Sequence, residues 1–176
     1  MIGWGWIAAY TLLLYATIPF ARTWLNFLRN MLGASFSFWV NVSLALVGVI
    51  LLAFFWISQT LNRKQWIALI AIGLAVCLFM SEMGIPEERI HLLEYAGLGY
   101  LLVWAFRSRY QNILLYHRAL GLVLLIGIGD EVIQGALPNR IFDLRDILFN
   151  TLGGTAGIMV AASTFPSTEV LDRVEG

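Results

Sequence analysis

Charge is scarce in this sequence. Only 12% of its 176 residues are Asp, Glu, Lys or Arg, whereas 60% are hydrophobic. This apolar share is well above the roughly 45–50% of an ordinary soluble domain, which excludes water as the solvent of most of the surface. The eleven basic and eleven acidic residues balance, so no nucleic-acid partner is expected.

Cysteine is almost absent too. The single Cys77 lies inside an apolar run, which excludes an intramolecular disulfide and a thiolate metal cage. No two-histidine zinc motif or phosphate-binding glycine loop occurs, so the sequence assigns no metal ligand and no cofactor. The first residues, from Met1 to Trp6, are apolar rather than basic, so this segment is expected to be a retained membrane helix and not a cleaved signal.

Long apolar runs are abundant. A helix needs about 20 mostly apolar residues to cross the roughly 30 Å hydrocarbon layer of a membrane. The segments that satisfy this are 2–20, 36–58, 65–82, 89–106, 118–136 and 146–164. The sequence therefore predicts an all-α, polytopic transmembrane helix bundle of about six spans. It forms one domain over residues 1–164, followed by a short solvated tail over 165–176.

The stretch between the first two predicted spans is amphipathic. Its apolar residues recur at helical spacing, and its polar residues take the opposite face. The apolar set is Trp24, Leu25, Leu28, Met31 and Leu32, and the polar set is Arg22, Asn26, Arg29 and Asn30. This pattern predicts an interfacial helix that lies along the membrane surface, with a plain connecting loop as the alternative.

The distribution of basic residues sets the expected orientation. Six spans place both termini on one side, where six basic residues lie against five on the other. The positive-inside rule then favours cytoplasmic termini in a bacterial inner membrane. The start of the fourth span, the end of the fifth and the start of the sixth would face the cell exterior or periplasm.

Polar residues gather at these same three places, and we expect them to form one ligand-binding site. They are His91, Glu94, Tyr95, Asp130, Glu131, Gln134, Arg140, Asp143, Asp146 and Asn150. The first three share one helical face, and so do Asp130 and Gln134, while Glu131 points about 100° away toward a different neighbour. Gly153 and Gly157 continue the last group as a small-xxx-small pattern, which permits close contact between helices.

The acids of this cluster outnumber its arginines, and the excess negative charge needs an offset. Protons shared between carboxyls, a hard cation or a cationic group on a ligand would each supply it. His91, Glu94 and Asp130 are candidates for general acid and base catalysis. The structural alternative is an ion-paired lock of three helix ends, centred on a bidentate pair of Arg140 with Asp143 or Asp130.

The order of these motifs resembles the bacterial VanZ-like membrane family. The pattern is His91-x-x-Glu94-Tyr95, then Asp130-Glu131-x-x-Gln134, then Arg140-x-x-Asp143-x-x-Asp146-x-x-x-Asn150-x-x-Gly153, within residues 86–160. The resemblance implies a multi-pass protein of the cell envelope and a link to antibiotic resistance, because the family's namesake is associated with low-level resistance to the lipoglycopeptide teicoplanin. Where the family often has a lysine before its histidine, this chain has Glu88 and Arg89.

These observations favour an outward-facing polar pocket that recognises a glycolipid, a lipid-linked sugar or a lipoglycopeptide headgroup. Two alternatives stay open: an intramembrane enzyme that acts on an envelope lipid, and a small ion-coupled transporter with protonatable Asp130 and Glu131. The absence of a visible internal repeat disfavours the transporter. Membrane lipids are the expected partners, and the sequence leaves a homo-oligomer open.

Overall fold

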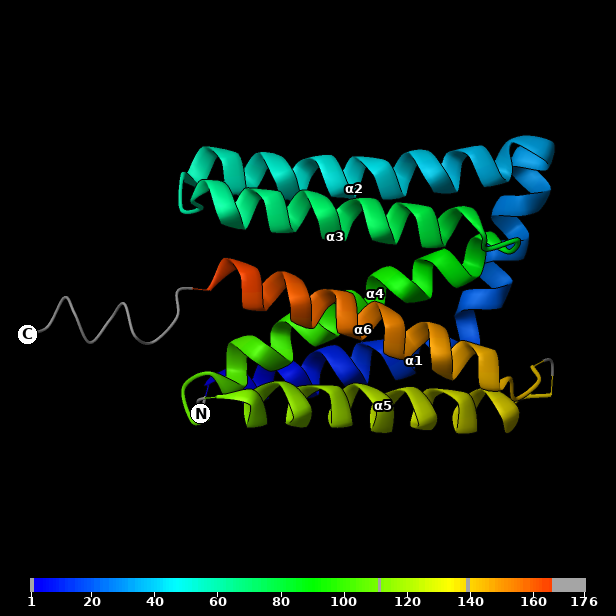
Figure 1. The fold of residues 1–176 in the computed structure, drawn as a ribbon. Coiled ribbons are helices and arrows are strands. Elements are labelled where there is room, and N and C mark those ends of the chain that lie inside the picture. The colour runs from blue at the N-terminus through cyan, green and yellow to red at the C-terminus, as the bar shows by residue number, and fades with distance from the viewer. Residues whose placement is uncertain (1, 111, 139, 166–176) are drawn as a thin grey trace, which may run out of the picture.

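The fold is a bundle of helices, shown in Figure 1 by a computed structural model that describes residues 2–110, 112–138 and 140–165. Its elements are α1 (Ile2–Leu32), the short 3-10 helix η1 (Gly33–Ser35), α2 (Phe36–Ser58), α3 (Arg63–Ser81), α4 (Pro86–Phe106), α5 (Ile113–Gly135) and α6 (Leu144–Thr164). No strand occurs in these ranges. The prediction of an all-α fold is therefore confirmed, whereas the predicted tail lies outside the described residues from position 166 onward.

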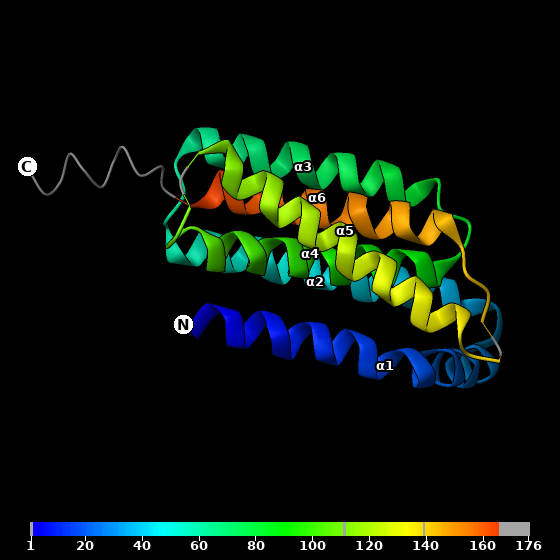
Figure 2. The ribbon, with the colours of Figure 1, turned by 90° about the horizontal axis from the view of Figure 1, so that it is seen from below.

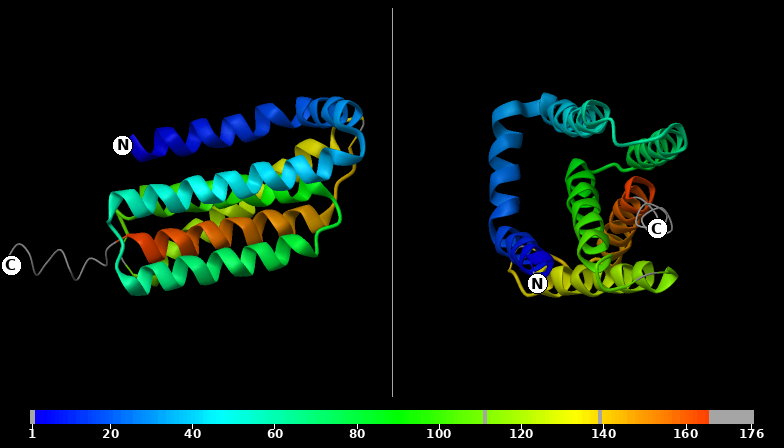
Figure 3. Two further views of the ribbon diagram at one scale, coloured as in Figure 1. Left: turned by 90° about the horizontal axis from the view of Figure 1, so that it is seen from above. Right: turned by 90° about the vertical axis from the view of Figure 1, so that its left-hand side faces the viewer.

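Helix α4 lies at the centre of the bundle. It contacts α1, α5 and α6, and its most extensive contact is with α6 (Figure 3). Tyr95, Leu98 and Leu102 follow one another along α4 and are fully buried. Their side chains fill the core from the polar end of the bundle toward the opposite end.

Glycines on α6 allow the close approach of α4. A Cβ atom on Gly153 would overlap the backbone carbonyl of Leu92, and one on Gly157 would overlap that of Ala96. The predicted close contact through this small-residue pattern is thus confirmed, and its partner is α4. Gly99 on α4 faces Gly154 in the same way.

Helix α1 changes direction within its length. Pro19 lies inside it, and the Thr17 hydroxyl donates back to the carbonyls of Leu13 and Leu14; both features bend helices. The second half of α1 consequently runs across one end of the bundle before η1 leads into α2 (Figures 2 and 3). The predicted amphipathic segment is therefore helical and continuous with the first span, with Trp24 and Met31 exposed.

Helices α2 and α3 expose apolar side chains widely. Phe36 is the only buried residue of α2 and Leu69 the only one of α3. Phe79 of α3 packs edge to face on Phe149 of α6, with ring centroids 5.8 Å apart. Such surfaces are favourable in lipid and unfavourable in water.

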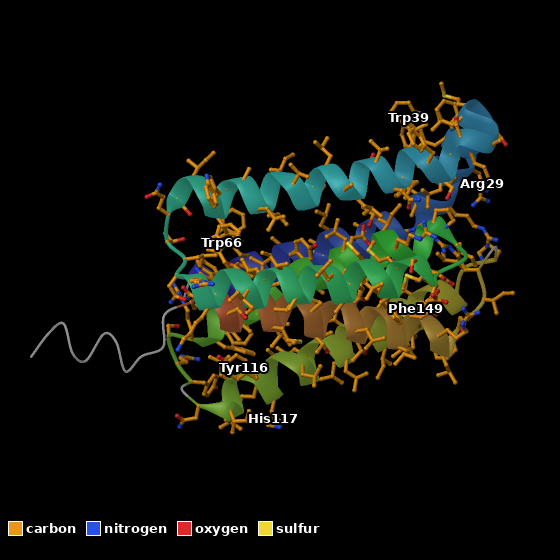
Figure 4. All side chains as sticks on the ribbon, turned by 45° about the horizontal axis from the view of Figure 1, so that its top comes forward. Arg29, Trp39, Trp66, Tyr116, His117 and Phe149 are labelled. Carbon is orange, nitrogen blue, oxygen red and sulfur yellow. The ribbon has the colours of Figure 1, made fainter. Side chains whose placement is uncertain are left out.

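Aromatic side chains mark both ends of the bundle. Figure 4 shows Trp66 and Tyr116 near one end, and Trp39 near the other. Amphipathic rings at two levels are typical of the two membrane–water interfaces. Within the described residues, four helical stretches are long and apolar enough to cross a membrane, namely Gly3–Ser58, Arg63–Ser81, Ile113–Gly135 and Leu144–Thr164.

The number of spans is not fixed by these four stretches. The first of them contains both α1 and α2, and α4 is not among them. The polar residues in the first turns of α4 lower its mean hydropathy, although its side chains are shielded by its neighbours. The prediction of about six spans thus stays a prediction.

The close contact between α4 and α6 predicts a large effect of a single methyl group. Gly157→Ala should lower the free energy of unfolding by about 1–3 kcal/mol or more, because the backbone of Ala96 cannot move away easily. The melting temperature of the detergent-solubilised protein should fall accordingly. Gly48→Ala in α2 is the matched control, since nothing lies within 4 Å of its Cβ position. Equal melting temperatures for the two variants would contradict the packing described.

Candidate functional site

The predicted polar residues lie together at one end of the bundle. Successive helices run in opposite directions, so the start of α4, the end of α5 and the start of α6 meet there, beside the second half of α1 (Figure 1). A cavity of about 110 Å³ lies at this meeting point. Its polar lining consists of His91, Glu94, Asp130, Gln134 and Arg140, together with Thr17 of α1.

Two of the lining residues form a close pair. His91 Nδ1 lies 3.3 Å from Glu94 Oε2, and the two side chains are 21% and 37% exposed. The contact meets the distance of an ion pair but not the alignment of a hydrogen bond, and Nδ1 is buried with no hydrogen-bond partner among the described residues. Buried polar atoms nearly always have such a partner.

Asp130 is held from two sides. The Tyr95 hydroxyl donates to Oδ2 at 3.0 Å, and the Gln134 amide donates to Oδ1 at 3.3 Å. Each carboxylate oxygen has two lone pairs, so both retain acceptor capacity toward the cavity. Tyr95 itself is fully buried and orients Asp130 from the core side.

Glu131 connects α5 to the start of α6. It is fully buried, its Oε1 accepts from Gln134 Nε2 at 3.0 Å, and its Oε2 accepts from the backbone N–H of Asp143 at 2.9 Å. Both acids accept from Gln134, but Glu131 also contacts Asp143 before α6, whereas Asp130 contacts Tyr95 of α4. It does not line the cavity, so its contacts make it a tie between helix ends.

The remaining predicted residues support α6. Asp143 precedes the helix as its N-cap, with Oδ1 accepting from Arg145 N–H at 2.8 Å, so it lies before the first helical turn. Asp146 follows in the first turn, where an acid is favourable near the helix N-terminus. Asn150 is buried one turn deeper beside Gly127, with no hydrogen-bond partner for its amide among the described residues.

Among the described residues, Arg140 does not form the ion pair on which the predicted lock of helix ends was centred. No ion pair joins Arg140 to Asp143 or Asp130 within the described part of the chain, and Arg140 instead lines the cavity. Arg89 donates to Asn41 of α2 at 2.6 Å and to the carbonyl of Met83, so it is turned away from the cavity. The helix ends are tied by hydrogen bonds through Tyr95, Asp130, Gln134 and Glu131. An ion pair of Arg145 Nη2 with Glu88 Oε1, 3.8 Å apart, also joins the start of α6 to the start of α4.

The contribution of α1 was missed at the level of sequence. Leu14, Thr17, Ile18, Ala21 and Leu25 line the cavity from this helix. Tyr10 and Tyr15 fasten α1 to the other helices, since their hydroxyls donate to the carbonyls of Glu94 and Ile126, each at 2.8 Å. In the sequence, two tyrosines five residues apart in an apolar run could have indicated a contact with other helices. They do not specify which helices α1 contacts.

A wider recess adjoins the cavity beneath the second half of α1. It measures about 470 Å³ and shares Ile18 and Arg140 with the cavity. Its other lining residues are Pro19, Arg22, Thr23, Asn26, Leu137 and Pro138. The cavity and this recess therefore lie next to each other, and the recess has two arginines in its lining.

The structure therefore defines an all-helical protein with membrane-grade apolar helices and one polar site at the end of the bundle. The family model described as VanZ/LLP1 matches residues 6–165, so the chain belongs to the VanZ/LLP1 family. This match confirms the resemblance and begins well before residue 86, so it includes α1, which the motifs alone did not identify. No curated protein and no solved structure matches this chain significantly.

Proposed function

We propose that this protein is an integral protein of the bacterial cell envelope whose polar cavity recognises the headgroup of a glycolipid, a lipid-linked sugar or a lipoglycopeptide. The observation that supports this most is the position of the cavity, which lies at one end of an apolar bundle and is bordered by a transverse amphipathic helix. Headgroups occupy this depth of a membrane, and they combine charge with hydrogen-bonding groups.

Each lining residue has a role in this proposal. Arg140 contacts a phosphate or carboxylate of the headgroup, for which the guanidinium fork is suited. Glu94 and Asp130 accept hydrogen bonds from hydroxyl or amine groups, and His91 adds a further donor or acceptor. Glu131, Asp143 and Asp146, which were expected to contact the ligand, instead stabilise the helix ends around the cavity.

We also propose that the chain crosses the bacterial inner membrane six times, with cytoplasmic termini and the cavity on the outer side. The transverse half of α1 then lies in the outer interface, and the α2–α3 and α4–α5 connections face the cytoplasm. Shielding of α4 by α1, α5 and α6 supports its assignment as a span, because its polar residues face neighbouring helices rather than lipid.

The orientation predicts which connections an impermeant thiol reagent reaches in intact cells. In a Cys77→Ala background, Ile141→Cys in the exposed α5–α6 connection should react, whereas Thr60→Cys between α2 and α3 should react only after the membrane is opened. The two positions lie at opposite ends of the bundle. Labelling of position 60 in intact cells, or of both positions alike, would contradict this topology.

An enzyme that acts on such a lipid is the second candidate. The close pair of His91 with Glu94, 3.3 Å apart in the cavity wall, favours acid and base chemistry there. A transporter has less support, because fully buried apolar side chains, including Leu98, Leu102 and Val123, fill the core beyond the site. An enzyme predicts that His91→Ala still binds a headgroup but forms no product.

Lipid that copurifies with the protein tests the proposed recognition. Native mass spectrometry of wild type extracted from its own membrane should show one defined lipid class retained, and Arg140→Ala should lose it by roughly tenfold or more, because a charge-assisted contact is removed. Arg63→Ala, at the opposite end of the bundle, is the matched control and should retain it.

A structural lock predicts a different pattern in the same measurement. Wild type and Arg140→Ala would then carry the same mixture of bulk lipids, and only the melting temperature would fall in the variant. That outcome would contradict the proposed function.

A further inference from the structure

The inner cavity and the outer recess differ in the charged residues that line them. Glu94 and Asp130 are the acids that line the inner cavity, which Arg140 also lines. The outer recess is lined by Arg22 and Arg140 and, among the described residues, by no acid. Arg140 lies at the boundary, since it lines both spaces. A ligand that occupies both spaces is therefore complementary when it is cationic inside and anionic outside.

The size of the cavity limits what enters it. The inner cavity measures about 110 Å³ and the outer recess about 470 Å³. We therefore expect a short aminoalkyl group in the inner cavity and the larger part of a headgroup in the outer recess.

The inner wall offers acceptors that suit a primary ammonium group. Such a group has three N–H donors and needs acceptors in several directions. The carboxylates of Glu94 and Asp130 supply them from two different helices. His91 Nδ1 lies in the same wall, 3.3 Å from Glu94 Oε2 and with no hydrogen-bond partner among the described residues. A hydrogen-bonded cation there also offsets the acidic excess that the sequence leaves without a balancing charge.

The outer recess offers apolar surface next to its arginines. Ile18, Pro19, Leu137 and Pro138 line it, and the adjoining Trp24 and Phe27 of α1 are exposed. Acyl chains attached to a phosphate at Arg140 would therefore continue over apolar side chains into the lipid phase.

We infer that the site binds a membrane phospholipid whose headgroup carries a primary ammonium group in the inner cavity and a phosphate at Arg140 in the recess. The inference rests on the proposed headgroup recognition at this site and extends its ligand classes to a phospholipid with an amine.

Three phospholipids with identical acyl chains, each added in detergent to the solubilised protein, test this inference. They carry ethanolamine, choline or glycerol headgroups, and binding is measured by native mass spectrometry. Wild type should prefer the ethanolamine lipid by roughly tenfold or more, because choline has no N–H donor and glycerol has no cation. Equal retention of the three lipids by wild type would overturn the inference.

Variants assign the preference to the cavity. Glu94→Gln and Asp130→Asn should each lower binding of the ethanolamine lipid toward the level of the choline lipid. Glu82 is an exposed acid at the same end of the bundle, and Glu82→Gln should keep the preference for ethanolamine. Melting temperatures are compared so that Glu94→Gln remains informative if Asp130→Asn does not fold. A preference that survives Glu94→Gln and Asp130→Asn in folded protein would also overturn the inference.

A lipid-linked sugar in a parallel arm separates the two proposals. If wild type retains that lipid and shows no preference for ethanolamine, headgroup recognition stands and the inference fails. If wild type retains neither class above the level of bulk lipid, both fail.

Discussion

The close contact between α4 and α6 is the constraint on which the rest of this structure depends. Helix α4 carries His91 and Glu94 in a chain otherwise built for lipid, so it is stable only where neighbouring helices cover it. The glycines of α6 let its backbone approach that of α4 until Gly157 lies against the Ala96 carbonyl. This approach holds the polar start of α4 beside the polar end of α5.

A hydrogen-bonded chain fixes the geometry of that meeting point. It runs from Tyr95 on α4 through Asp130, Gln134 and Glu131 on α5 to the backbone of Asp143 before α6. Both carboxylate oxygens of Glu131 accept hydrogen bonds within this chain, so Glu131 orients the helix ends. Asp130 is the acid of α5 that lines the cavity. A structural role for this hydrogen-bonded chain is therefore compatible with the ligand-binding role that we propose for the residues lining the cavity.

Much of the architecture was predictable from local pattern. Apolar runs of span length predicted α2 to α6 within five residues at each end, since α2 begins and ends as expected and α5 starts five residues earlier. The first predicted span ended at residue 20, whereas α1 continues to Leu32. The grouping of polar residues at alternate ends of successive spans predicted that they would meet. Motif order gave the family, which the match over residues 6–165 confirms.

Other features depend on tertiary contacts that helical spacing does not encode. Spacing shows that Asp130 and Gln134 share a face, but not that Tyr95 would be the partner of Asp130. It shows that Arg22 and Asn26 lie on a polar face of α1, but not that this face covers a recess. The bend that brings the second half of α1 there follows from Pro19, whose effect on direction a sequence pattern leaves undetermined.

The central claim, that a headgroup occupies the space beneath the second half of α1, is tested most directly by site-specific crosslinking in the native membrane. A photoreactive amino acid at Asn26, which lines the recess, is compared with one at Met31, which lies on the same half-helix and is 67% exposed. We predict one defined lipid or lipoglycopeptide adduct at position 26 and a mixture of bulk lipids at position 31. The same mixture at both positions would contradict the account.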